Sequence, residues 1–375
     1  MNSINNQFKI DTDQFLSFVL PTFNESENII LLLDELLSNF GDFQLELIVI
    51  DDNSSDGTHN LVRERAKKDS RIRLINRLDR SGLSSAIKEG CLNASGEIIA
   101  IMDTDGQHQV SVMKDAIKKL LYNRLDVVIG SRFHNESEIK GLSQKRENGS
   151  KIANSVARFS LPKNYNHLED YMSGCIVLQR ESCICLIKKI DVNGFKFLYE
   201  LLAISKGRLK VNETSMSFQP RKYGVSKFNL AIIWDFLISL LHTICRRIIP
   251  RKAISFAFVG AIGVLIQMFT FYCSIIFLGI SFNNALTFAV VVAASSNFLI
   301  NNWLTFSTTR LRNKALIIGL FKFLLVSSLP IIANIGLATS FYKYISPNSF
   351  FSQISAIIIV YIWNYAASSR LVWNR

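Results

Sequence analysis

The amino-acid sequence predicts an α/β domain with a mostly parallel sheet, followed by an α-helical transmembrane domain. Two observations support this fold class. Up to about residue 227, short apolar runs alternate with helical patterns, which is typical of a parallel sheet covered by helices on both faces. Beyond residue 250 the chain has four long apolar segments. Each is long enough to cross the core of a bilayer, which needs about 20 residues.

Composition limits the kind of partner that the chain can have. The 375 residues are 49% hydrophobic and 19% charged, and the formal net charge is +12. Much of the basic excess flanks the apolar segments, which favours lipid head groups over nucleic acid. The six cysteines form no CxxC pair, so we expect reduced thiols rather than a zinc site. The polar tail 1–14 has no apolar signal-peptide core, so we expect the first domain to remain in the cytoplasm.

Five short apolar runs predict strands in the first domain, which we place at residues 15–227. The runs are Phe15–Leu20, Leu45–Ile50, Ile72–Ile75, Glu97–Met102 and Asp126–Ile129. Helical patterns lie between them, and they begin after Asn28, at Asp56-Gly57-Thr58, after Gly82 and at Val110. In such an alternation the carboxyl ends of the parallel strands meet at one edge of the sheet, where ligands bind.

Acidic motifs follow two of these predicted strands. Asp51 and Asp52 end the second run, and the segment Asp103–His108 follows the fourth. Asp103 and Asp105 are spaced so that both carboxylates can point the same way, and oxygen ligands suit Mg²⁺ or Mn²⁺ together with phosphates. The alternative is a solvated acidic turn, but the position at a strand end favours a metal site. For His108, packing or hydrogen bonding is a simpler role than metal ligation.

The acidic motifs belong to an ordered series, which includes Pro21-Thr22-Phe23-Asn24-Glu25, Gly130-Ser131-Arg132-Phe133, Arg146 with Ser150 and Ala153-Asn154, Asp170 with Ser173-Gly174, Gly194-Phe195-Lys196 with Glu200, and Phe218-x-x-Arg221 with Gly224-x-Ser226-Lys227. This series resembles the signature of the family 2 glycosyltransferases, and more narrowly that of the dolichyl-phosphate mannosyltransferase and polyprenyl-phosphate sugar transferase branch. The resemblance covers about residues 15–230 and implies a GT-A-type fold. Ser84 and Val110 depart from it, at positions where glycine and proline are usual.

The resemblance also implies roles for individual residues. Nucleotide-sugar binding would fall to Pro21, Phe23, Glu25, Ile50, Asp52, Asp103, Thr104, Asp105, Gln107, Val192 and Lys196. The metal ligands would be Asp105 and Gln107, and the catalytic residues Asp103, Asp105, Arg132 and Arg221. The lipid phosphate would be bound by Arg132, Arg146, Ser150, Arg221 and Lys227. The arginines suit this role because their planar guanidinium groups match phosphate oxygens.

The implied activity is the inverting transfer of a hexose from a nucleotide sugar to dolichyl or polyprenyl phosphate. The product would be a β-linked lipid phosphate sugar, with Mg²⁺ or Mn²⁺ as cofactor. Mannose from GDP-mannose is the expected donor, and glucose from UDP-glucose, or another nucleotide sugar, is the alternative. A rival of another class is a transport or assembly protein whose soluble domain only binds nucleotide sugar. The intact set Asp103, Asp105, Gln107, Arg132 and Arg221 favours the enzyme.

Segment 228–250 is apolar but interrupted by charged residues, so we interpret it as interfacial amphipathic helices; a fifth transmembrane helix is the alternative. The domain 251–375 should hold four spans at about 253–278, 284–306, 316–340 and 352–373. Basic residues cluster before the first span, between the second and third, and after the fourth. The positive-inside rule therefore predicts that both termini and the catalytic domain are cytoplasmic.

The membrane part has a second resemblance. The stretch Asn297–Phe306 resembles the GtrA-like four-helix membrane domain, which is associated with polysaccharide synthesis. Asn297-Phe298 and Asn364-Tyr365 each come nine residues before an aromatic residue, which indicates a two-plus-two arrangement of helices. Four asparagines are expected within or near the bilayer, namely Asn297, Asn301, Asn302 and Asn364. They either hydrogen-bond between helices or line a path for a sugar head group.

Overall fold

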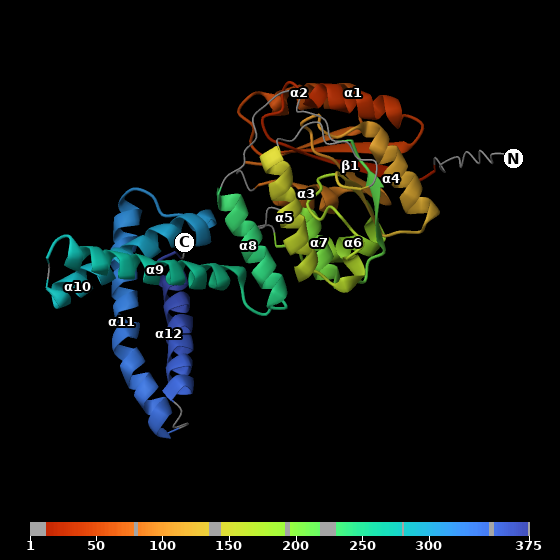
Figure 1. Cartoon of the computed structure of the whole chain (residues 1–375). Helices are drawn as coiled ribbons and strands as arrows, with labels where there is room; N and C mark the ends of the chain where they lie inside the picture. Colours follow the sequence, from red (N-terminus) through yellow and green to blue (C-terminus); the bar gives the residue numbers. More distant parts are fainter. Residues whose placement is uncertain are drawn as a thin grey trace. The chain divides into compact units, whose positions relative to one another are not determined.

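The computed structural model describes residues 13–78, 82–134, 144–191, 196–217, 230–279, 281–344 and 349–373. Within these ranges, the side chains of residues 144–146, 230–232, 308, 329–339, 341–342, 349–354 and 356 are not described. The chain forms two compact units, Met1–Thr243 and Ile244–Arg375 (Figure 1).

In the first unit, the described residues form a seven-stranded sheet with the order β3-β2-β1-β4-β6-β5-β7. The strands are β1 (Phe15–Thr22), β2 (Gln44–Asp51), β3 (Ile72–Asn76), β4 (Ile98–Ile101), β5 (Val127–Ser131), β6 (Ile176–Gln179) and β7 (Val211–Ser215). Only β6 runs antiparallel to its neighbours β4 and β5. The other pairs in the sheet are parallel, which confirms the mostly parallel sheet predicted from the alternation of strands and helices.

Helices cover both faces of this sheet. They are α1 (Ile29–Asn39), α2 (Thr58–Lys68), α3 (Leu83–Asn93), α4 (Val110–Tyr122), α5 (Gln144–Ser160), α6 (Arg180–Ile187) and α7 (Phe197–Ser205). Side chains of α1, α2 and α4 share a core with Phe18 and Leu20 of β1. Those of α3, α5, α6 and α7 share the opposite core with Val19. Alternate residues of β1 thus enter opposite cores, as the period of two in a strand requires.

Helix α8 (Leu230–Ile244) closes the first unit. The ring of Phe236 meets the ring of Tyr199 of α7 edge-on, with centroids 5.9 Å apart, and Leu240 is buried in the core on that face. Ile233 and Leu237 are exposed. The helix therefore has one face packed on the α/β unit and another apolar face outside that core, and its predicted place on the membrane surface stays a prediction.

The second unit consists of α9 (Arg251–Ile276), α10 (Phe282–Ile300) with a π-helical turn at Asn301–Thr305, α11 (Lys314–Tyr344) and α12 (Ser349–Leu371). Helix α9 packs on α10, and α11 packs on α12, which agrees with the two-plus-two arrangement. Two helices within the described part of the chain, Arg251–Ile276 and Phe282–Thr305, are long and apolar enough to cross a membrane.

A buried cluster joins the ends of three segments in the second unit. The ring of Trp373 stacks on that of Phe306, with centroids 4.2 Å apart and planes 6° apart. Its indole N–H donates to Oδ1 of Asn302 over 3.1 Å. Asn302 also accepts from the backbone N–H of Leu311 and donates to the carbonyl of Leu311. These bonds support the interpretation of Asn302 as a residue that connects helices.

Candidate active site

Hydrogen bonds hold together the loops that follow β1 and β2. The backbone N–H of Asn24 donates to Oγ of Ser54 over 2.8 Å, and that of Ser26 donates to Asp56 over 3.0 Å. Asp56 also accepts from the N–H and the hydroxyl of Thr58 at the start of α2. Burial alone would raise the pKa of Asp56, but the hydrogen bonds from Thr58 and Ser26 outweigh it and lower the pKa to about 2. A charged Asp56 thus fixes the loop that carries Phe23 and Glu25, two of the predicted donor-binding residues.

Strand register brings other predicted donor-binding residues together. Pro21 of β1 lies opposite Ile50 of β2. The hydroxyl of Thr104, which follows β4, donates to the carbonyl of Pro21 over 3.2 Å. Asp52 is buried just after β2, where its carboxylate pairs with Arg77 at 3.0 Å and accepts from the N–H of Gly82 at 2.9 Å. These residues therefore line one edge of the sheet, at the carboxyl ends of β1, β2 and β4.

The acidic segment after β4 forms a tight turn. The side chains of Asp105 and Gln107 are buried, and Oδ1 of Asp105 accepts from the N–H of Gln107 over 3.1 Å. Gly106 has a positive φ of 73°, which glycine adopts without strain. Nε2 of His108 lies 4.0 Å from Oδ2 of Asp103. The segment gathers carboxylate and amide oxygens at a strand end, a donor set that fits Mg²⁺ or Mn²⁺.

Asp103 lies against a glycine in a small cavity. A Cβ atom on Gly174 would come within 2.2 Å of Oδ2 of Asp103, so this carboxylate occupies space that any other residue would fill. Lys196, at the start of α7, lines the same cavity. Burial, and then the charge of Arg132, lower the pKa of Lys196 to about 8. The charges of Asp103 and Arg132 are thus close enough to Lys196 to act on its pKa.

Arg132, at the end of β5, is held by a buried carboxylate. Its Nε and Nη2 donate to Oδ2 and Oδ1 of Asp170 over 2.7 and 2.9 Å. Burial by itself would lower the pKa of Arg132, but the charge of Asp170 outweighs it and raises the pKa. Asp170 is positioned in turn by Glu213, whose carboxylate accepts from the N–H groups of Asp170 and Glu169. Arg132 is therefore a charged group with a fixed orientation.

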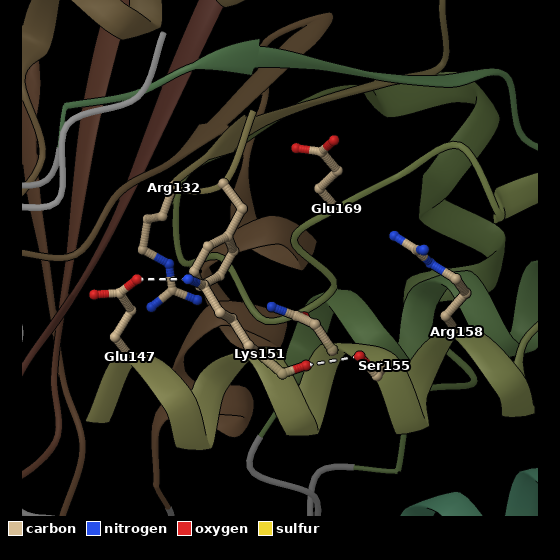
Figure 2. Close-up of a pocket in the computed structure, with 8 residues that line it drawn as sticks. Arg132, Glu147, Lys151, Ser155, Arg158 and Glu169 are labelled. Atoms are coloured by element: carbon tan, nitrogen blue, oxygen red, sulfur yellow. Dashed lines mark hydrogen bonds and ion pairs between the residues drawn. The ribbon is translucent and has the colours of Figure 1, made fainter. Parts of the chain in front are cut away.

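Arg132 also lines a cleft of about 550 Å³ beside α5, which we call the α5 cleft (Figure 2). Its lining residues are Arg132, Phe133, Glu147, Lys151, Asn154, Ser155, Arg158 and Glu169. Lys151 pairs with Glu147 at 2.7 Å, and Nη2 of Arg158 donates to the carbonyl of Leu168 over 2.9 Å. Figure 2 shows the cationic side chains together with Glu147 and Glu169. The cleft therefore offers several donors to an anionic ligand.

Several other predicted site residues either do not line this cleft or are not described by the structure. Ser150 lies on α5 but is not among the residues that line the cleft. The side chain of Arg146 is not described, and Val192, Arg221 and Lys227 lie outside the described residues. The sequence-based site did not include Lys151 and Arg158, although their spacing of seven residues along a helix indicates one polar face.

The residues thus form two features, an acidic segment at the carboxyl ends of parallel strands and a cleft lined by three cationic and two acidic side chains. Comparison with known proteins identifies this arrangement. Residues 17–187 match the family Glycosyl transferase family 2, and residues 255–373 match GtrA/DPMS, transmembrane domain. The α/β unit is accordingly a GT-A-type glycosyltransferase domain, and the chain is a membrane protein.

The chain belongs to the family 2 glycosyltransferases that bear a GtrA/DPMS transmembrane domain. It is 31% identical to dolichol-phosphate mannosyltransferase from Pyrococcus furiosus over 298 residues, which are 79% of this chain and 82% of that protein. It is 30% identical to dolichyl-phosphate beta-glucosyltransferase ALG5D from Trichomonas vaginalis over 241 residues, 61% of this chain and 72% of that one. It is also similar to the structure of glucosyl-3-phosphoglycerate synthase from Mycobacterium tuberculosis, at 19% identity and a TM-score of 0.46 over 62% of this chain and 80% of that one.

Proposed function

We propose that this protein transfers a hexose from a nucleotide sugar to dolichyl or polyprenyl phosphate and inverts the anomeric centre. The main support is that Asp103 of the acidic segment lines one cavity with Lys196, while Arg132, whose charge acts on Lys196, lines the α5 cleft. Such a site can hold an anionic donor and an anionic acceptor side by side. GDP-mannose is the first candidate donor, since a mannosyltransferase matches most of the chain. UDP-glucose is the second, since beta-glucosyltransferases match it as well.

The donor would lie along the carboxyl edge of β1, β2 and β4. Pro21, Phe23, Glu25, Ile50 and Asp52 would contact its nucleoside. Asp105 and Gln107 would hold Mg²⁺ or Mn²⁺, together with the donor's diphosphate. When bound, this ion would offset negative charge on the nucleoside diphosphate as it leaves. Asp103, Thr104, Val192 and Lys196 would complete the donor site.

The acceptor needs little activation by the protein. Its phosphate is already ionised at neutral pH, so an oxygen of that phosphate can attack the anomeric carbon without a general base. One bond forms from this oxygen to the anomeric carbon, and the bond from that carbon to the nucleoside diphosphate breaks. Because the displacement occurs in a single in-line step, an α-linked donor gives a β-linked product.

Arg132 has two effects in this step. It offsets the repulsion between the two anions, and its rigid pairing with Asp170 keeps its donors in position before the substrates arrive. Arg146, Ser150, Arg221 and Lys227 would add contacts to the lipid phosphate. A nucleotide-binding transport protein would not need this fixed guanidinium next to the donor site.

We further propose that the second unit spans the membrane four times, with both termini and the catalytic unit in the cytoplasm. The basic residues at the helix ends support this orientation. Arg251 and Lys252 begin α9, and Lys314 begins α11, whereas Arg370 lies near the end of α12. These positions fall on one side of a four-span arrangement, as the positive-inside rule requires.

The first test is direct transfer by the purified full-length chain. The protein would be incubated with polyprenyl phosphate, a panel of GDP- and UDP-sugars, and Mg²⁺, Mn²⁺ or a chelator, and the lipids would then be extracted. We expect one nucleotide sugar to give a lipid phosphate sugar, and the chelator to abolish this product. Asp105→Ala should reduce transfer about 100-fold or more, because it removes a charged metal ligand.

Asp115→Ala is the matched control, since Asp115 is an exposed carboxylate on α4, away from the strand-end edge. It should transfer at the normal rate, and both variants should unfold at the temperature of the unchanged protein. Full turnover by Asp105→Ala in chelator would refute the metal site. Absence of any glycolipid product with every donor would refute the proposed function.

A further inference from the structure

Among the residues of α5 that line the α5 cleft, Asn154 is the most deeply buried. It lies in the middle of α5 and is only 5% exposed. Its Oδ1 accepts a hydrogen bond from the backbone N–H of Tyr171 over 2.9 Å. Only the oxygen of the amide can accept from an N–H group, so this bond fixes the orientation of the amide. The other end of the amide is therefore the NH₂ group.

That NH₂ group has no hydrogen-bond partner among the described residues. Within the part of the chain that the structure describes, Nδ2 of Asn154 is buried and makes no hydrogen bond. Leaving a buried amide donor unpaired costs about 1–3 kcal/mol, so native proteins rarely do so without a ligand. Because Asn154 also lines the α5 cleft, a ligand in the cleft is the natural partner for Nδ2.

The groups around the cleft indicate the chemistry of this ligand. Arg132, Lys151 and Arg158 are cationic, and Glu147 and Glu169 are acidic. Glu147 forms an ion pair with Lys151. Asp170 forms an ion pair with Arg132 and holds its side chain in one orientation. An amide donor among guanidinium and ammonium groups suits a ligand with several anionic oxygens, such as a phosphate.

We propose that Asn154 binds the acceptor, donating a hydrogen bond from Nδ2 to an oxygen of the polyprenyl phosphate. The inference rests on the proposed function and adds a residue to that site. Lys151 precedes Asn154 by three residues on α5, so the two lie on one side of the helix, and both line the α5 cleft. In this arrangement α5 contacts the phosphate with polar groups on successive turns, and Arg132 contacts it from the end of β5.

The sharpest test is Asn154→Asp. An aspartate keeps an oxygen that accepts from Tyr171, so the buried bond to the backbone is retained. It replaces the NH₂ donor by a negatively charged oxygen next to the phosphate. We expect the KM for the acceptor to rise at least tenfold, while the KM for the nucleotide sugar stays within twofold. A merely structural role would not separate these two constants.

The matched control is Asn123→Asp, which makes the same chemical change at an exposed residue after the end of α4, at the other edge of the sheet. Its KM values should equal those of the unchanged protein. Asn154→Ser serves as a second variant if the aspartate variant unfolds. It removes the amide donor without adding charge and should raise the acceptor KM at least threefold. All variants would be assayed as full-length chains with farnesyl phosphate and with a long polyprenyl phosphate.

The outcomes separate this inference from the proposed function. If the unchanged protein makes lipid phosphate sugar and the folded Asn154 variants keep a normal acceptor KM, Asn154 does not bind the phosphate, and the proposed function stands. If the variants lose affinity for nucleotide sugar instead, the α5 cleft belongs to the donor and the inference is wrong. If the unchanged protein transfers sugar to neither acceptor, the proposed function fails, and the inference fails with it.

Discussion

Gly174 leaves space for the carboxylate of Asp103 because it has no side chain. It precedes β6, and an ideal Cβ at this position would lie 2.2 Å from Oδ2 and 2.8 Å from Cγ of Asp103. Its φ is not in the left-handed region, so its backbone would tolerate alanine. Space for the carboxylate of Asp103, rather than backbone freedom, is therefore the reason for glycine here.

Gly174→Ala should displace Asp103 and impair the donor site. We expect transfer to fall at least tenfold, because the carboxylate must move by more than an ångström to escape a contact of 2.2 Å. The unfolding temperature should change little, since Asp103 can turn toward the cavity that it lines. Steady-state transfer and thermal unfolding of the detergent-solubilised protein would measure the two effects.

The control for this variant is Gly149→Ala. Gly149 is a helical glycine of α5 with open space around its Cβ position, so alanine should leave activity unchanged and stabilise the helix by up to about 1 kcal/mol. Normal transfer by Gly174→Ala would show that the position of Asp103 is not important for the donor site.

The sequence patterns predicted which residues lie at the site. They did not predict which of these residues form ion pairs with one another. The strand ends of β1, β2 and β4 follow from the apolar runs, so the meeting of Pro21 with Ile50 and Thr104 was predictable. The pairing of Arg132 with Asp170 spans 38 residues, and that of Asp52 with Arg77 depends on where β3 ends. Such pairs are set by the tertiary fold, and no local pattern encodes them.

At the scale of elements, the first five strands were predicted within two residues at each end. One difference of two residues is at β1, where the apolar run was expected to end before Pro21. The structure extends β1 to Thr22, since its pairing with β4 stops at Val19 while its pairing with β2 continues. Proline lacks only the N–H donor, and it is tolerated where one side of a strand has no partner.

Strands β6 and β7 were not predicted. β6 enters the sheet antiparallel between β4 and β5, which the alternation of strands and helices in a parallel sheet does not predict. β7 reads as a polar segment, with Glu213 buried in the middle. The buried carboxylate is tolerated because it accepts two backbone N–H groups, from Glu169 and Asp170. The sequence alone does not reveal that these donors are available.

In the membrane unit, the cluster around Asn302 joins α10, α11 and the end of α12. Asn302→Ala would leave the N–H and the carbonyl of Leu311 and the indole N–H of Trp373 without a side-chain partner. We expect this variant to lower the free energy of unfolding by about 3 kcal/mol, because buried polar groups lose their hydrogen bonds. Unfolding by added denaturing detergent would measure the change.

Two further variants make this test specific. Trp373→Phe retains a ring that can stack on Phe306 but removes the donor to Asn302, so its effect should be smaller. Asn283→Ala removes an exposed asparagine at the start of α10 and should change the free energy by less than about 0.5 kcal/mol. Equal stability of the Asn302 and Asn283 variants would contradict a connecting role for the cluster.

At the scale of the whole molecule, the chain divides between Thr243 and Ile244. We predicted the glycosyltransferase domain to end at residue 227 and the membrane domain to begin at 251, with a separate bridge between them. In the structure, α8 of this bridge packs through Phe236 and Leu240 onto the core that also contains Tyr199. A shortened catalytic unit should therefore keep α8, whose removal would expose apolar surface of that core.

This division leads to a prediction about a chain truncated after residue 250. The groups proposed to bind donor, metal and acceptor phosphate all precede residue 228, so the truncated chain should fold and bind nucleotide sugar and metal. It should also transfer sugar to a short prenyl phosphate. Transfer to a long polyprenyl phosphate should be much less efficient than with the full chain, because the membrane no longer concentrates and orients this acceptor.

The comparison needs both acceptors and both proteins, after circular dichroism and thermal unfolding show that the truncated chain is folded. Loss of efficiency with the long acceptor alone would indicate that the helices α9 to α12 anchor the enzyme and give access to lipid. A folded truncation that binds nucleotide sugar but transfers to neither acceptor would show that these helices complete the acceptor site. In that case the chemistry would not be confined to the α/β unit, and the division of labour argued from the placement of Asp105, Arg132 and Asn154 would be wrong.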